Sequence, residues 1–170
     1  MATYNGERFL QEQVDSIISQ LGSSDELVVV DDASTDNTVA HLQRLNDSRI
    51  RIYRSSSNAG HVQSFAKALS LATCSVILMA DQDDLWLEGR AQAMRDALIR
   101  SDAALVSTNS EFMDATGHPI PVLHAGLAES DSKRHATNIA RIFLGRAYYD
   151  GCAMGLRADL RTLVLPIPKY

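Results

Sequence analysis

The sequence lacks several features that would each assign it to a familiar class of protein. Its two cysteines, Cys74 and Cys152, are too few for a disulfide framework and have no metal-finger spacing, so we expect two buried, reduced thiols. No apolar run reaches the ~18 residues of a membrane-spanning helix, and no basic-then-apolar leader opens the chain. Basic residues are also in deficit, with 16 Lys and Arg against 21 Asp and Glu and a net charge of −5. These features predict a cytoplasmic protein that binds no nucleic acid and has no transmembrane segment, with docking at the inner face of a membrane left open.

What the sequence does contain is an alternation of strand-like apolar runs with helical stripes. The 170 residues suit one domain, 1–170, by length. Alternating strands and helices predict an α/β fold with a mostly parallel sheet flanked by helices, followed by a small hairpin arm near 111–119. The expected helices are 6–21, 39–45, 62–71, 88–100 and 136–144, and the expected strands are 27–30, 50–53, 76–80, 103–108 and 151–156.

Acidic residues follow two of the predicted strands. In open α/β sheets, ligands bind outside the carboxyl ends of the strands. Like charges gathered there raise one another's pKa, and a hard cation such as Mg²⁺ or Mn²⁺ would relieve the repulsion. Residues two apart in an extended segment point the same way, so Asp81 and Asp83 are the expected ligands and Gln82 points away. For Asp31 and Asp32, helix capping and turn formation remain an alternative to ligand binding.

Four segments, in their order and spacing, resemble the signatures of family 2 glycosyltransferases, which have the GT-A fold. The nearest resemblance is to a bacterial branch that includes rhamnosyltransferases of surface polysaccharide synthesis. It implies metal-dependent, inverting transfer of a sugar from a UDP- or dTDP-sugar to a hydroxyl of a glycan or lipid-linked glycan. It also implies a nucleotide-sugar-binding half over 1–108 and a partial acceptor-side half over 109–170. The segments are Thr3-Tyr4-Asn5-Gly6-Glu7, Val30-Asp31-Asp32-Ala33-Ser34-Thr35-Asp36, Asn58-Ala59-Gly60 and Asp81-Gln82-Asp83-Asp84-Leu85-Trp86.

The resemblance also implies a role for each donor-binding residue. Tyr4 stacks near the base, and Thr3 and Asn5 shape that pocket. Asp32 hydrogen-bonds the uracil or thymine ring, with Asp31 behind it.

The remaining donor contacts come from two later segments of the chain. Asn58 and Gly60 line the donor site. The Asp81-Gln82-Asp83 segment is similar to the family's DXD motif, in which Asp83 binds the metal and Asp81 lies by the ribose or metal.

Two departures from the family pattern lead us to expect a chain truncated at both ends. The acidic general base of inverting members would lie beyond Tyr170, and we assign no such role to Asp159. The first strand is nearly absent, which predicts a gap in the sheet that a homodimer would cover.

The main alternative function is a catalytically inactive nucleotide-sugar-binding module, because the general base would be missing. A nucleotidyltransferase ranks lower, because the turn at 3–7 has one glycine and no basic residue before Arg8. The absence of a G-x-x-x-x-G-K pattern excludes a phosphate-loop ATPase.

Overall fold

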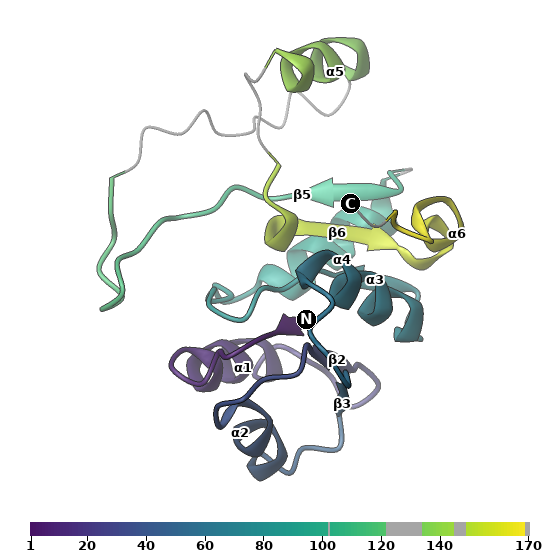
Figure 1. Ribbon diagram of the computed structural model, residues 1–170. Coiled ribbons are helices and arrows are strands. Elements are labelled where there is room, and N and C mark those ends of the chain that lie inside the picture. Colours follow the sequence, from purple (N-terminus) through teal and green to yellow (C-terminus); the bar gives the residue numbers. More distant parts are fainter. Residues whose placement is uncertain (102, 122–133, 145–148, 169–170) are drawn as a thin grey trace.

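The computed structural model describes residues 1–101, 103–121, 134–144 and 149–168, and it contains two three-stranded sheets (Figure 1). The first sheet is parallel and has the order β1-β2-β3. Its strands are β1 (Ala2–Thr3), β2 (Leu27–Asp31) and β3 (Ile50–Arg54). The predicted parallel α/β arrangement is therefore confirmed here, with a first strand of only two residues.

The second sheet is antiparallel and has the order β4-β6-β5. Its strands are β4 (Val76–Leu78), β5 (Leu105–Ser107) and β6 (Met154–Arg157). All three lie within predicted strand segments or extend them by one residue. Their antiparallel pairing was not predicted, because an apolar run shows that a strand is buried but does not show its direction.

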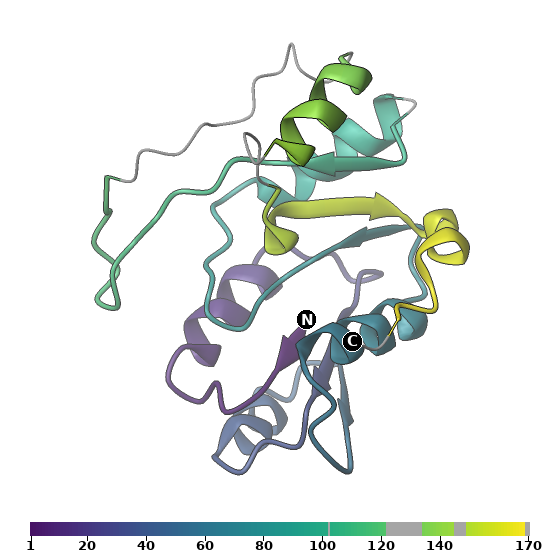
Figure 2. The same cartoon turned by 45° about the horizontal axis from the view of Figure 1, so that its top comes forward.

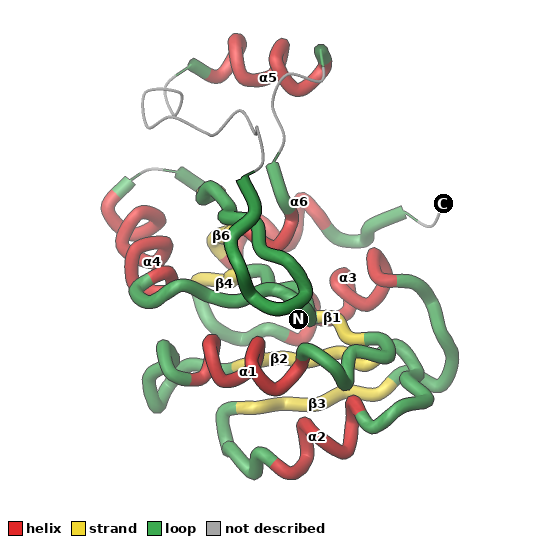
Figure 3. Tube along the Cα trace, turned by 90° about the vertical axis from the view of Figure 1, so that its left-hand side faces the viewer, coloured by secondary structure: helices red, strands yellow, loops and turns green. Residues whose placement is uncertain are grey.

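Helices cover both faces of the parallel sheet, as Figure 3 shows. Side chains of β2 alternate between these faces: Val29 packs in the core with α1 and α2, whereas Val28 and Val30 pack against α3. This explains why positions 27–30 of β2 are apolar without interruption. The helices are α1 (Leu10–Ile18), α2 (Thr38–Arg44), α3 (His61–Leu71), α4 (Arg90–Arg100), α5 (His135–Phe143) and α6 (Arg161–Val164), with 3₁₀ turns at Gly151–Ala153 and Ala158–Leu160.

Residues 108–121, which follow β5, extend away from this core (Figure 2). In Figure 1, α5 stands apart from both sheets. The predicted hairpin arm is confirmed by an antiparallel bridge between Met113 and Pro119 and by a 2.8 Å hydrogen bond from the Ile120 amide to the Phe112 carbonyl. Within the described residues, no helix has the length and apolar character needed to cross a membrane.

Candidate functional site

The turns that follow β1 and β2 are bonded to each other at the carboxyl edge of the parallel sheet. Asn5, in a left-handed conformation with φ 48°, donates its amide to Ser34 Oγ at 2.9 Å. Its side-chain Oδ1 accepts the Thr35 amide at 2.9 Å. Thr3 is buried and donates its hydroxyl to Asp31 at 3.3 Å. Tyr4, held between these two anchors, is 46% exposed and free to meet a ligand.

Asp31 is fully buried and organises the turn after β2. Its carboxylate accepts the Ser34 amide at 3.0 Å and lies 3.6 Å from Nε of Arg54. A buried carboxylate needs such partners, because an unpaired charge in the interior is very costly. Asp31 therefore stabilises the turn after β2 from the interior and does not reach the protein surface.

Asp32, also buried, joins the end of β2 to the loop that precedes α3. One carboxylate oxygen accepts the Ala59 amide at 2.9 Å and the other accepts the Gly60 amide at 2.8 Å. Gly60 has φ 87°, which glycine adopts most easily. Exposed Asn58 also accepts the Gly60 amide, at 3.1 Å. Each carboxylate oxygen of Asp32 has a second lone pair that can accept a further hydrogen bond.

The segment after β4 is bonded to the turn after β1. The Tyr4 amide donates to Gln82 Oε1 at 2.8 Å, and Gln82 Nε2 donates back to the Tyr4 carbonyl at 3.2 Å. From α1, Gln13 Nε2 donates to the Asp81 carbonyl at 2.8 Å. The fold thus places the aspartates after β4 beside the ends of β1 and β2.

The carboxylates of the segment after β4 lie close enough together to change the pKa of Asp81. Partial burial raises the pKa of Asp81, and the nearby Asp84 and Asp83 carboxylates raise it further. Asp81, Asp84 and Cys152 each place a ligand atom within 4.8 Å of the others, whereas Asp83 is exposed and is not in this group. Because the backbone bends at Gln82 and Asp83, the alternation of an extended strand does not apply here. From sequence, Asp84 was expected behind the metal ligands or as a helix cap, and Cys152 was not considered as a neighbour of the aspartates.

The chemistry of this group suits a hard cation. Burial, and then the Asp84 carboxylate, raise the pKa of the Cys152 thiol to about 12. The thiol is therefore neutral near pH 7, and the two carboxylates supply the oxygen atoms of this group. One buried oxygen of Asp84 has no hydrogen-bond partner among the described residues. Crowded carboxylate oxygens fit Mg²⁺ or Mn²⁺ better than a soft metal.

Trp86 and Arg90 connect the acidic segment to the core and to the turn before β6. Trp86 is 7% exposed and belongs to the main core. The Arg90 guanidinium lies 4.4 Å from the centre of the Trp86 ring. It also donates to the carbonyls of Met79, at 3.4 Å, and of Cys152. Arg90 thus ties β4 to the turn before β6, a role that sequence reasoning did not consider.

The parallel sheet with its acidic carboxyl edge, joined to an antiparallel second sheet, defines a GT-A-like α/β domain. The family model described as "Glycosyl transferase family 2" matches residues 1–164, and the chain belongs to this family.

The curated relatives of this chain are bacterial glycosyltransferases. The chain is 34% identical over 116 residues to a dTDP-rhamnosyl transferase, RfbG, of Shigella flexneri, covering 64% of this chain and 40% of the relative. It is 26% identical over 114 residues to the Escherichia coli UDP-Glc:alpha-D-GlcNAc-diphosphoundecaprenol beta-1,3-glucosyltransferase WfgD, covering 67% and 45%. The chain thus spans about half or less of the length of these relatives.

Solved structures support the fold. S. aureus TarS 1-349 in complex with UDP-GlcNAc superimposes with a TM-score of 0.74 at 19% identity, over 98% of this chain and 47% of TarS. The mannosyltransferase PcManGT from Pyrobaculum calidifontis, in complex with GDP-Man and Mn²⁺, gives 0.70 at 21% identity, over 98% and 46%.

Proposed function

We propose that this chain is the donor-binding part of a glycosyltransferase that moves a sugar from a UDP- or dTDP-sugar to an acceptor hydroxyl. The acceptor is a glycan or lipid-linked glycan of a bacterial surface polysaccharide, and transfer inverts the anomeric carbon. Family membership and the relatives named above support this proposal. Residues 1–108 form the donor half, and 109–170 contribute to the acceptor side.

The single observation that carries the proposal is the meeting of three segments at one edge. Tyr4 follows β1, Asp32 follows β2 and Asp81 comes from the segment after β4, and hydrogen bonds join the first and last of these segments. This edge is where open α/β sheets bind ligands.

In the proposed donor site, Tyr4 stacks on the base while Thr3 and Asn5 hold its backbone in place. Asp32 accepts a hydrogen bond from the ring N–H of uracil or thymine, with Asp31 behind it. Such a bond uses the acceptor positions that the loop amides leave free.

Two further segments complete the proposed donor site. Asn58 and Gly60 form its wall, and Gln82 fixes the donor-facing turn through its two bonds to Tyr4.

The proposed metal is Mg²⁺ or Mn²⁺, held by Asp81 and Asp83, with Asp84 as a neighbouring oxygen ligand or orienting group. A bound divalent cation stabilises the charge that develops on a departing diphosphate. The raised pKa of Asp81 supports the assignment, because burial and the neighbouring Asp84 and Asp83 carboxylates outweigh the opposite effects of His61 and the N-terminus.

Isothermal titration calorimetry with UDP and dTDP, in Mn²⁺ and in chelator, tests the donor site. We expect metal-dependent binding that Asp83→Asn and Asp81→Asn each weaken at least tenfold. Asp96→Asn, in α4 and outside the proposed site, is the matched control and should bind like wild type. Equal affinity in chelator and in Mn²⁺ would refute the metal assignment.

Transfer is tested separately from binding. Release of UDP or dTDP from the donor should depend on an added lipid-linked glycan. Tight nucleotide binding without acceptor-dependent release would favour the alternative of a binding module without transfer activity.

A further inference from the structure

Three polar side chains of the α1 region are bonded to the acidic segment, residues 80–89, and to the start of α4. They are Gln13, Ser16 and Gln20, spaced three and four residues apart, so they share one side of the helix and of the turn that ends it. Of the four buried residues of α1, Gln13 alone is polar. A buried amide is unfavourable unless it is hydrogen-bonded, so the partners of this polar stripe indicate what it does.

Gln13 and Ser16 bind the two ends of the stretch that carries the aspartates. Gln13 Nε2 donates to the Asp81 carbonyl at 2.8 Å, and Ser16 Oγ accepts the Trp86 amide at 3.0 Å. The Ser16 hydroxyl donates in turn to the Gln13 carbonyl at 2.7 Å, which directs its oxygen toward Trp86. The aspartates therefore lie on a short stretch of backbone that is attached to α1 at both ends.

Gln20 binds the backbone where the acidic segment leads into α4. Its Nε2 donates to the Ser16 carbonyl at 2.9 Å and to the Leu87 carbonyl at 3.1 Å, and its Oε1 accepts the Ala91 amide at 3.2 Å. Ala91 lies in the first turn of α4, whose N-cap residue Gly89 has no side chain to accept such a bond. Gln20 thus satisfies an amide that has no partner within the helix.

The acidic segment has little regular structure of its own to hold it. Among the described residues, no backbone-to-backbone hydrogen bond involves positions 80–86. On the side away from α1, Gln82 is bonded to the backbone of Tyr4. The path of the segment therefore depends on side chains, and the polar stripe supplies those on the α1 side.

We propose that Gln13, Ser16 and Gln20 are positioning residues for the metal-binding carboxylates. By fixing the backbone of the acidic segment, they keep Asp81 and Asp83 at the spacing that a divalent cation needs. This inference rests on the proposed function, because it takes the metal site proposed there. Residues that orient metal ligands commonly change metal affinity by ~10–100-fold when they are replaced.

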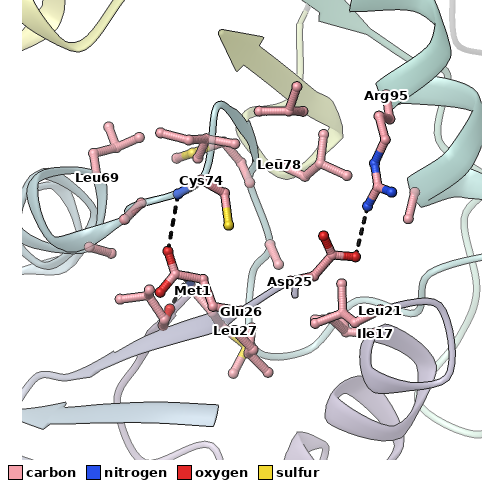
Figure 4. A pocket seen from close by; sticks show the side chains of 18 of the residues that line it. Met1, Ile17, Leu21, Asp25, Glu26, Leu27, Leu69, Cys74, Leu78 and Arg95 are labelled. Atoms are coloured by element: carbon pink, nitrogen blue, oxygen red, sulfur yellow. Dashed lines mark hydrogen bonds and ion pairs between the residues drawn. The ribbon is translucent and has the colours of Figure 1, made fainter. Parts of the chain in front are cut away.

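Another contact of α4 allows positioning to be separated from stability. Arg95, in the middle of α4, lies 2.8 Å from the carboxylate of Asp25, and Figure 4 shows the two side chains directed toward each other. This ion pair joins α4 to the segment before β2 and lies outside the acidic segment. Its removal by Asp25→Asn should lower the thermal midpoint and leave Mn²⁺ affinity unchanged.

The test measures Mn²⁺ affinity of the whole chain by electron paramagnetic resonance of the free ion, with folding checked by circular dichroism. We expect each stripe variant to bind Mn²⁺ about tenfold more weakly than wild type. Gln11 is exposed on α1 and donates to Asp15, so Gln11→Met is the matched control and should bind like wild type. The stripe variants are Gln13→Met, Ser16→Ala and Gln20→Met.

Amide hydrogen exchange provides a readout that needs no metal. Ser16→Ala should speed exchange of the Trp86 amide, and Gln20→Met that of the Ala91 amide, by about tenfold or more, because each amide loses its acceptor. Exchange at 59–60, which Asp32 protects, should stay as in wild type. Ser16→Thr keeps a hydroxyl and should recover most of the protection and of the Mn²⁺ affinity that Ser16→Ala loses.

Several results would overturn the inference. They are wild-type exchange at Trp86 and Ala91 in the stripe variants, wild-type Mn²⁺ affinity in all three, or an equal loss of affinity in Asp25→Asn. The last result would mean that affinity simply follows stability. A wild-type chain that binds no Mn²⁺ would instead refute the proposed metal site, and the exchange rates would then decide on their own whether the stripe holds the segment.

Discussion

Glu26 provides the most quantitative test of how the two sheets are held together. Burial alone would raise the pKa of its carboxyl, but hydrogen bonds from Thr73 and the ion pair with Arg51 outweigh burial and lower the pKa from 4.5 to about 2. The Glu26 side chain is 12% exposed and that of Arg51 is 35% exposed. The native state therefore prefers the ionised carboxylate, whose partners lie on β3 and on the segment between α3 and β4.

The size of the effect follows from the pKa difference. A shift from 4.5 to about 2 corresponds to about 3 kcal/mol, and solvent screening of the partly exposed Arg51 reduces this to about 2 kcal/mol. Because the folded-state pKa is the lower one, this stability is present above pH 4.5. It is lost as the pH falls toward 2.

We expect Glu26→Gln to lower the free energy of unfolding by about 2 kcal/mol at pH 7, measured by urea denaturation followed by circular dichroism. The difference from wild type should shrink steadily between pH 4.5 and pH 2. Glu111→Gln, an exposed residue of the hairpin arm, is the matched control and should leave stability unchanged at every pH. A variant as stable as wild type at pH 7, or equally destabilised at pH 7 and pH 2, would refute the reasoning.

Three further predictions concern the candidate site at the carboxyl edge of the parallel sheet and the residues that hold it in place. A Cβ at Gly6 would overlap the Gln82 side chain, so Gly6→Ala should displace Gln82, cost about 1–3 kcal/mol of stability and weaken UDP binding, as urea denaturation and calorimetry would measure. Asp32→Asn replaces one acceptor oxygen with an amino group that faces a loop amide. It should lower the free energy of unfolding by about 2 kcal/mol or more and speed hydrogen exchange at 59–60, and unchanged exchange there would contradict this role. Arg90→Met removes the stacking on Trp86 and two bonds to carbonyls, and should lower the thermal midpoint by several degrees, with Arg90→Lys recovering only part of the loss.

Much of the architecture could be predicted from local sequence patterns. The alternation of apolar runs and helical stripes correctly located β2, β3 and the helices around them, because helix and strand periods are set by neighbouring residues. The short first strand was also expected. The family resemblance was confirmed by the match over residues 1–164.

The tertiary structure decided which side chains meet. Asp32 is bonded to amides 27 and 28 residues away, and Tyr4 to Gln82 across 78 residues. No local pattern encodes such pairings, because they depend on how the strands are ordered and on where each loop turns. For the same reason Cys152, distant in sequence, lies beside Asp84.

The sequence by itself determined the elements, their order and the acidic character of the carboxyl edge. Only the tertiary structure decided the antiparallel direction of β6, the grouping of Asp84 with Asp81, and the pairing of Gln82 with Tyr4. Periodicity reports whether a residue is buried, whereas strand direction and side-chain convergence arise when segments distant in sequence pack together.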